Sequence, residues 1–288
     1  MVRREPRLLG IDRTRWTLAT VGTAVPWLAD HTASGVWRVL DTLDVVLKRA
    51  RDHVHSPDPA YEAKRAAIAR CLAEARDGAG RVVALFQDEV TLHRHPSLAC
   101  AYAARGRDHP LAERGLRGDA TARIVGTLDA RDGRVVWRRR RTLDLPALVG
   151  FYRDVAAAYP AADRIAIILD NWPVHFHPDL LVALAPQDCP FPFPRPGNWP
   201  TEPSAAAVRK WGELQLPIRL VPLPTYASWL NPIEQLWRWL RQEVVHLHPW
   251  ADAVPTLYAE ADRFLGRFTH GAPACQDLLR YVGLETAH

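Results

Sequence analysis

The strongest constraint on the fold comes from short apolar runs that are followed at once by acids. Residues 165–169 are all apolar and are followed directly by Asp170. A strand formed here has no polar face, so other elements must cover it on both sides. Residues 82–86 form a second such run, with Asp88 just beyond it, and residues 218–223 read as a further strand. These patterns predict an α/β domain built around a buried sheet.

The segments between these strands fit the same architecture. Residues 121–128 and 134–138 alternate as strands do, and the intervening residues 129–133 end in Asp-Gly, a strong hairpin signal. Residues 145–159 carry an apolar stripe at helical spacing, and residues 230–245 read as a second helix. Strand, hairpin, helix, strand, then strand and helix is the order of a mixed α/β domain.

Composition narrows the class of protein. The chain has 288 residues, of which 48% are apolar and 24% charged, so wholesale disorder is excluded. No apolar run approaches the roughly 20 residues that cross a bilayer, and the N-terminus lacks a signal-peptide pattern. We therefore expect a soluble, cytoplasmic protein with no membrane partner.

The cysteines and the net charge bear on metal sites and partners. The four cysteines form no C-x-x-C pair and read as free thiols. The net charge of +5 permits nucleic-acid binding.

Changes in composition and in the pattern of apolar residues along the chain predict four segments. Residues 1–60 read as a basic helical module, 61–79 as a linker helix, 80–255 as the main α/β domain and 256–288 as a helical tail. Inside the first part, residues 27–47 read as two helices separated by a break at 31–35. Ser34 is the expected N-cap of the second helix, and its core-facing stripe is Val36, Leu40 and Leu43.

Three acids stand where chemistry is expected in an open α/β sheet. Asp88 and Asp170 follow buried strands, and Glu234 begins the helix after the last strand. Carboxylates gathered at one sheet edge suit Mg²⁺ or Mn²⁺, and two such ions could clamp a phosphoryl transfer. Each acid also has a structural interpretation that involves no catalysis. The aspartates could end strands or form turns, Glu234 could cap its own helix, and Glu89 should point to the opposite face from Asp88.

The sequence segments around the three acids resemble those of a known family. The matching segments are Gln87-Asp-Glu, residues 167–175 (Ile-Ile-Leu-Asp-Asn-Trp-Pro-Val-His) and residues 223–237 (Leu-Pro-Thr-Tyr-Ala-Ser-Trp-Leu-Asn-Pro-Ile-Glu-Gln-Leu-Trp). Together they resemble the three catalytic blocks of DDE transposases, in the mariner-related bacterial branch called insertion-sequence family 630. The third block is the most specific, and order and context agree over roughly residues 30–246.

The resemblance implies a fold, a reaction and a site. The fold would be an RNase H-like catalytic core, a mixed five-stranded sheet flanked by helices, preceded by a helix-turn-helix module. The reaction would be metal-dependent DNA strand cleavage and strand transfer at element ends, with two Mg²⁺ or Mn²⁺ ions. The partners would be terminal inverted repeats and target DNA, bound as a homodimer at the bacterial nucleoid. The implied catalytic residues and metal ligands are Asp88, Asp170 and Glu234; supporting residues are Asn171, His175 and Asn231; DNA-binding residues are Arg38, Lys48, Arg49 and Arg51.

Two departures from the family keep alternatives open. The gap before Glu234 is about thirty residues longer than usual, and the proline-rich residues 186–217 account for the excess. This insertion could be a surface flap, or it could carry Trp199, Trp211 and Arg195 to DNA or a partner subunit. Relatives have two helix-turn-helix modules, whereas this chain has room for one. A truncated or repurposed DNA-binding protein without transposition activity is therefore the alternative function.

Two further motifs have competing interpretations. The four arginines at residues 138–141 follow a strand and could be a solvated edge or a phosphate contact. The pairs His93-x-His95 and His175-x-His177 could serve a zinc hydrolase, although nearby prolines suggest loops. His175 falls within the second block of the resemblance, so it fits better as a residue that orients the acidic site or the DNA.

Overall fold

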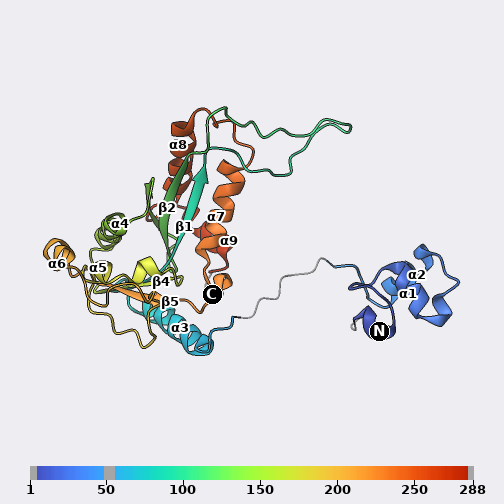
Figure 1. Ribbon diagram of the computed structural model, residues 1–288, viewed down its shortest axis with the longest axis horizontal. Helices are drawn as coiled ribbons and strands as arrows, with labels where there is room; N and C mark the ends of the chain where they lie inside the picture. Colours follow the sequence, from blue (N-terminus) through green and yellow to red (C-terminus); the bar gives the residue numbers. More distant parts are fainter. Residues whose placement is uncertain (1–4, 49–55, 285–288) are drawn as a thin grey trace. The chain divides into compact units, whose positions relative to one another are not determined.

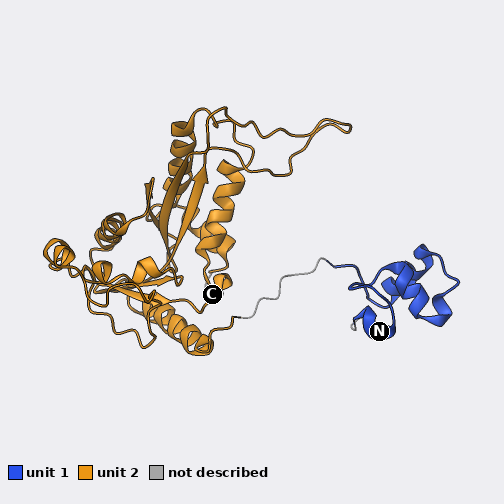
Figure 2. Cartoon of the chain, viewed as in Figure 1, with its two compact units in different colours: residues 1–53 blue, residues 54–288 orange. Residues whose placement is uncertain are grey.

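The chain divides into two compact units, Met1–His53 and Val54–His288 (Figure 2). The computed structural model describes residues 5–48 and 56–284. In that part of the chain no helix is both long and apolar enough to cross a membrane.

The first unit is a small helical module. Its elements are η1 (Pro6–Leu9), α1 (Leu18–Ala24), η2 (Pro26–Leu28) and α2 (Ala33–Thr42). Val21, Leu28 and Val36 form its core, with one residue from each of α1, η2 and α2. Helices this short are marginal alone, so this shared core is what holds them together.

Several details of this module differ from expectation. The first helix lies at α1, and Trp27 instead sits in η2 with its side chain 63% exposed. Thr32 caps α2 by accepting a hydrogen bond from the Gly35 amide, so Ser34 is inside the helix and is not the N-cap. Leu43 follows the last residue of α2 and is 63% exposed, so it leaves the predicted stripe.

The predicted DNA-binding residues are only partly covered by the structure. Arg38 lies on the exposed side of α2, and Lys48 is exposed beyond that helix. Arg49 and Arg51 lie outside the described residues.

The second unit is built on a mixed five-stranded sheet (Figure 1). Its strands run in the order β3-β2-β1-β4-β5. β1 pairs antiparallel with β2, and β2 with β3, as the predicted hairpin requires. β1 and β4 are parallel, and so are β4 and β5. The strands are β1 (Val82–His93), β2 (Thr121–Asp129), β3 (Val135–Arg140), β4 (Arg164–Leu169) and β5 (Ile218–Pro222).

Helices cover both faces of this sheet, as the apolar β4 requires. Residues Ile165 to Leu169 are all buried. One face packs against α4 (Leu145–Ala158) and α5 (Pro178–Leu181). The other packs against α3 (Tyr61–Asp77), α7 (Ile233–Leu240), α8 (Val254–Leu265) and α9 (Ala274–Val282). Shorter pieces are η3 (Pro173–Phe176), α6 (Ala205–Trp211), η4 (Ser228–Leu230), η5 (Arg241–Val245) and η6 (Gly266–Phe268).

Segments expected at the margins of the domain belong to its core. The predicted linker helix, α3, buries Ile68 against the sheet. The residues expected as a tail form most of α8 and all of α9, and they bury Leu257, Phe264 and Leu278 in the same cluster. Both helices are amphipathic, so their apolar faces need the sheet side to cover them.

The proline-rich insertion is attached to the domain surface and does not project from it. Phe193 stacks on Phe176 at a centroid distance of 4.7 Å, and Trp211 packs against the cluster on the α4 side. Trp199 contacts the ring of His177 at 4.9 Å. Arg195 donates to the carbonyl of Thr201, 3.5 Å away. The aromatic residues considered for DNA contact are therefore engaged within the chain.

A glycine sets the distance between α7 and the sheet. Gly126 on β2 lies directly opposite Asp88, and a Cβ added there would lie 2.8 Å from Cη2 of Trp237, which is 1% exposed. Gly126→Ala should push α7 outward and lower the free energy of unfolding by about 1–3 kcal/mol. Denaturant unfolding measures this loss.

The matched control is Gly118→Ala, because nothing lies within 4 Å of that position. If the contact causes the loss, a Trp237→Phe background should remove most of the cost of Gly126→Ala. An equal cost in both backgrounds would show that the glycine acts otherwise.

Candidate active site

The three predicted acids come from separate elements and line one pocket. Asp88 lies in the middle of β1, Asp170 directly follows β4, and Glu234 is in the first turn of α7. The pocket has a volume of about 470 Å³. The N-cap residue of α7, Pro232, makes no side-chain capping hydrogen bond, and Glu234 of the first turn lines the pocket. The structure thus places the three acids that the sequence singled out around one pocket, although their carboxylate oxygens do not all lie within 4.8 Å of one another.

Strand register explains how two of them meet. Phe86 on β1 is paired with Ile168 on the parallel β4. Asp88 lies two residues after Phe86, and Asp170 lies two residues after Ile168. The two aspartates are therefore side by side at the same height along β1 and β4. The prediction that Asp88 follows its strand is wrong, because β1 continues to His93 and pairs with β2 throughout. Alternation then sends Asp88 to the α7 face and Glu89 to the α4 face.

Two asparagines fix the backbone around the pocket. The side-chain amide of Asn171 donates to the carbonyl of Leu223 at 2.8 Å, which ties the end of β4 to the end of β5. That of Asn231 donates to the carbonyl of Gln87 at 3.0 Å, which ties the start of α7 to β1. The Oδ1 of Asn231 is buried and has no partner among the described residues. Both side chains therefore position the elements that carry the acids.

The acids raise one another's proton affinity. Burial, and then the nearby carboxylates of Glu89, Glu234 and Asp170, raise the pKa of Asp88 to about 7. Burial also raises the pKa of Asp170, although the Trp172 amide and His175 oppose it. The pKa of Glu234 is raised by burial, against the charges of Arg238 and Arg241. Each acid is thus held where its negative charge is costly unless a cation is nearby.

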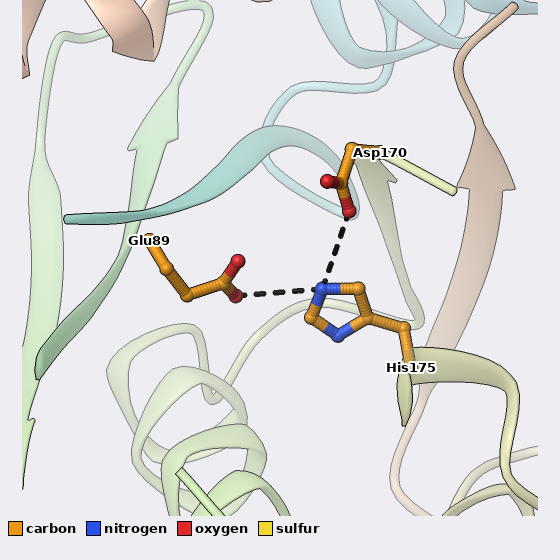
Figure 3. A group of neighbouring side chains, drawn as sticks. All are labelled: Glu89, Asp170 and His175. Carbon is orange, nitrogen blue, oxygen red and sulfur yellow. Dashed lines mark ion pairs between the residues drawn. The ribbon is translucent and has the colours of Figure 1, made fainter. Parts of the chain in front are cut away.

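Behind Asp170 lies a histidine that also contacts a fourth acid (Figure 3). His175 is 1% exposed, and its Nε2 is 3.5 Å from Oδ1 of Asp170 and 3.4 Å from Oε1 of Glu89. Its Nδ1 is 3.5 Å from the side-chain Nε2 of Gln87, and this Nε2 also donates to Oε1 of Glu89 at 3.2 Å. The Trp172 ring packs edge-on against the histidine at 5.1 Å. His175 is therefore placed to orient Asp170, as the sequence suggested.

Sequence reasoning missed the role of Glu89 in this group. The Glu89 side chain points away from Asp88, as predicted, and its carboxylate contacts His175. The available signal was Gln87, a polar residue at an inward position of an apolar strand. Gln87 is 1% exposed and shares this face with Glu89.

The two histidine pairs considered as zinc ligands do not come together in one site. His93 pairs with Asp119 at 2.7 Å, and His177 accepts a hydrogen bond from the Asp179 amide at the start of α5. Within residues 5–48 and 56–284, only Glu89, Asp170 and His175 bring three potential ligand atoms within 4.8 Å of one another. The structure therefore gives no support to a zinc site built from both pairs.

The family model described as "DDE superfamily endonuclease" matches residues 83–254, more than half of the chain and all three acids. The chain belongs to this family. A relative, the "Insertion element IS630 uncharacterized 39 kDa protein" of Shigella sonnei, is 21% identical over 250 residues. That match covers 86% of this chain and 63% of the relative. The chain thus spans less than two thirds of that relative's length, and the resemblance to the family 630 branch is confirmed.

Solved structures show the same fold. The Mos1 mariner paired end complex with Mn matches with a TM-score of 0.53 at 15% identity, covering 99% of this chain and 79% of that one. The Mos1 transposase paired-end complex with left transposon end matches with a TM-score of 0.52 at 16% identity, covering 98% and 79%. The predicted RNase H-like core, a mixed five-stranded sheet flanked by helices, is confirmed.

Proposed function

We propose that the protein is a DNA transposase that cuts DNA strands at element ends and transfers them to a target. The observation that carries the proposal is the convergence of Asp88, Asp170 and Glu234 on one pocket within the family-matched region. The alternative of a DNA-binding protein without transposition activity leaves this acidic convergence without a use.

The residues of the pocket fit divalent metal ions. Its donors are carboxylate oxygens, which hard cations prefer, and the raised pKa of each acid reflects charge that a cation would neutralise. The unpartnered Oδ1 of Asn231 adds a polar atom beside them. Asp88, Asp170 and Glu234 would hold two Mg²⁺ or Mn²⁺ ions. Bound there, the ions would lower the pKa of the attacking hydroxyl and neutralise charge on the transferring phosphate.

The chain's own contribution is to place these acids before DNA arrives. Asp170 is held by the Trp172 amide at 3.0 Å and by His175 behind it. Asn231 fixes the start of α7 and so the position of Glu234. In the proposed reaction, water attacks a phosphodiester at the element end. The freed 3′-hydroxyl then attacks target DNA in the same pocket.

Terminal inverted repeats and target DNA are the proposed partners, bound by a homodimer. The named Mos1 structures are paired-end complexes, one of them with the left transposon end. The exposed Arg38 and Lys48 of the first unit would contribute phosphate contacts. Arg49 and Arg51, which lie outside the described residues, are proposed as further phosphate contacts.

The test is a cleavage and strand-transfer assay with the inverted repeats that flank the gene. The purified chain is incubated with end-labelled duplex in Mn²⁺, in Mg²⁺ and in chelator. We expect metal-dependent cuts at the repeat that leave a 3′-hydroxyl, followed by joining to a plasmid. Duplex binding without any cut in either metal would instead support the DNA-binding alternative.

A further inference from the structure

One aromatic side chain at the acidic pocket is left in solvent. Tyr226 lines the same pocket as the three acids, and 75% of its surface is exposed. It belongs to neither apolar cluster of the second unit, and among the residues that the structure describes its ring stacks on no other ring and on no cation. Trp172, the other aromatic residue that lines the pocket, is packed against His175. The face of the Tyr226 ring is therefore open to a substrate.

The backbone at Tyr226 has a conformation that a tyrosine seldom adopts. Its φ is 55°, in the left-handed region. The amide of Ala227 donates to the carbonyl of Pro224 at 3.2 Å, so Tyr226 is the third residue of a β-turn. Glycine or asparagine usually occupies that place, because a larger side chain meets steric strain there. Strain of this kind is typical of functional sites, and here it keeps a large ring at the pocket.

The turn itself is held firmly by the start of the second unit. The amide of Thr225 donates to Oδ2 of Asp58 at 2.9 Å, and its carbonyl accepts from Oγ of Ser56 at 2.6 Å. Asp58 is in turn paired with Lys64 at 2.8 Å, and both of these side chains are at most 9% exposed. Because the turn is fixed before a substrate binds, little conformational entropy is lost when the Tyr226 ring makes a contact.

The chemistry of the pocket indicates what this ring meets. Under the proposed function the acids act on a phosphate of a DNA strand, so the nucleotides next to that phosphate lie at the pocket wall. Inside an intact duplex, both faces of a base are covered by its neighbours. Cutting the strand removes one neighbour, and the base beside the new 3′-hydroxyl then has an open face. Aromatic side chains stack on such bases, because every base has a π-face.

We propose that Tyr226 stacks on the 3′-terminal base of the cut strand and so keeps its 3′-hydroxyl in the pocket until target DNA arrives. The proposal rests on the proposed function and deepens it. The acids act on the phosphates of both reactions, whereas Tyr226 acts between the two reactions, when the cut end is free to leave. Stacking tolerates all four bases, so the contact does not depend on the sequence of the end.

The rate of joining, compared with the rate of cleavage, tests the proposal. Tyr226→Ala removes the ring and Tyr226→Phe keeps it. The substrate is a subsaturating repeat duplex that already ends in the 3′-hydroxyl, and joining to a plasmid is measured in Mn²⁺. Tyr226→Ala should join about tenfold more slowly than wild type, which corresponds to about 1.4 kcal/mol and lies within the range for the loss of one stacked base. Tyr226→Phe should join at close to the wild-type rate.

Cleavage of the uncut duplex by Tyr226→Ala should fall less than joining does, since the open base face exists only after the cut. The matched control is Tyr102→Ala, which removes a fully exposed tyrosine outside the pocket. Its ratio of joining to cleavage should equal that of wild type. The proposal is overturned by equal losses of cleavage and joining in Tyr226→Ala, by a Tyr226→Phe variant that is equally slow, or by a control with the same low ratio.

A change in the DNA separates stacking from a general defect. A precut duplex whose 3′-terminal nucleotide lacks its base offers the ring nothing to stack on. Without target DNA present, removal of this base should weaken binding by wild type about tenfold and should weaken binding by Tyr226→Ala no further. Fluorescence anisotropy of labelled duplexes measures both affinities. Equal losses for the two proteins would contradict the stacking contact.

Tyr226→Gly adds a readout that a structural role would not give. Glycine adopts a φ of 55° without steric cost, so this variant should melt no lower than wild type. Its rate of joining should nevertheless fall as far as that of Tyr226→Ala. A variant that melts several degrees below wild type would identify Tyr226 as a structural residue and overturn the proposal.

The proposal and the function fail separately, because binding of the precut end is measured without any reaction. A chain that never cuts, yet loses affinity for the end when either the ring or the base is removed, lacks the transposase function and keeps the end contact. A chain that cuts and joins equally well with and without the Tyr226 ring keeps the function and loses the end contact.

Discussion

Replacing Asp88 with Asn, Asp170 with Asn or Glu234 with Gln is expected to lower the rate of DNA strand cleavage by about 10³-fold or more. Each change keeps the side-chain shape but removes a charged oxygen ligand. Metal ions supply several kcal/mol of transition-state stabilisation, and each 1.36 kcal/mol is tenfold in rate. Single-turnover cleavage of a labelled repeat duplex in Mn²⁺ measures the loss.

The control for these variants is Asp163→Asn. Asp163 precedes β4, at the opposite end of that strand from Asp170, and it is exposed and paired with Arg81 at 2.6 Å. Its loss should leave the cleavage rate unchanged. A pocket variant that cuts at the wild-type rate would show that its acid is structural.

The metal-free protein should be more stable at pH 5 than at pH 8 because of the acidic pocket. The pKa of Asp88 is about 7 in the folded chain and 3.8 as a model value. The folded state therefore holds this proton more tightly, and the stabilisation is lost as pH rises from about 4 to 7. Between pH 5 and pH 8 the difference amounts to about 2–3 kcal/mol in the free energy of unfolding. Denaturant unfolding in chelator measures it.

Asp88→Asn supplies the comparison. In chelator at pH 8 this variant should be more stable than wild type, and its stability should lack that part of the pH dependence. Mn²⁺ at a hundred times its dissociation constant should stabilise wild type by about 2.7 kcal/mol, and the variant should lose most of this gain. A variant that is less stable than wild type at pH 8, with its response to Mn²⁺ intact, would identify Asp88 as a structural residue.

Much of the sheet could be predicted because its signals are local. The uninterrupted apolar run of β4, the Asp-Gly hairpin between β2 and β3, and the stripe of α4 each follow from a few neighbouring residues. The full length of β1 could not be predicted in this way. Its polar residues Gln87, Asp88 and Glu89 read as a strand end, but β2 pairs with all three, and Asp88 lines the pocket.

The site could be predicted in part. The resemblance named the acids, and the parallel register of β1 and β4 explains why two of them are level. Their catalytic roles stay predictions. The contact of Glu89 with His175 depends on a turn that folds back beneath Asp170, and no local pattern encodes it. The start of α7 could be predicted, but not the hydrogen bond from Asn231 to the Gln87 carbonyl that ties it to β1, because the two residues are 144 positions apart.

The place of the last two helices has a consequence for synthesis. Because α8 and α9 complete the apolar cluster against which α7 packs, Glu234 gains its final support only after residues as far as Val282 have joined the fold. A ribosome-bound or prematurely ended chain would display all three acids and still lack a rigid pocket.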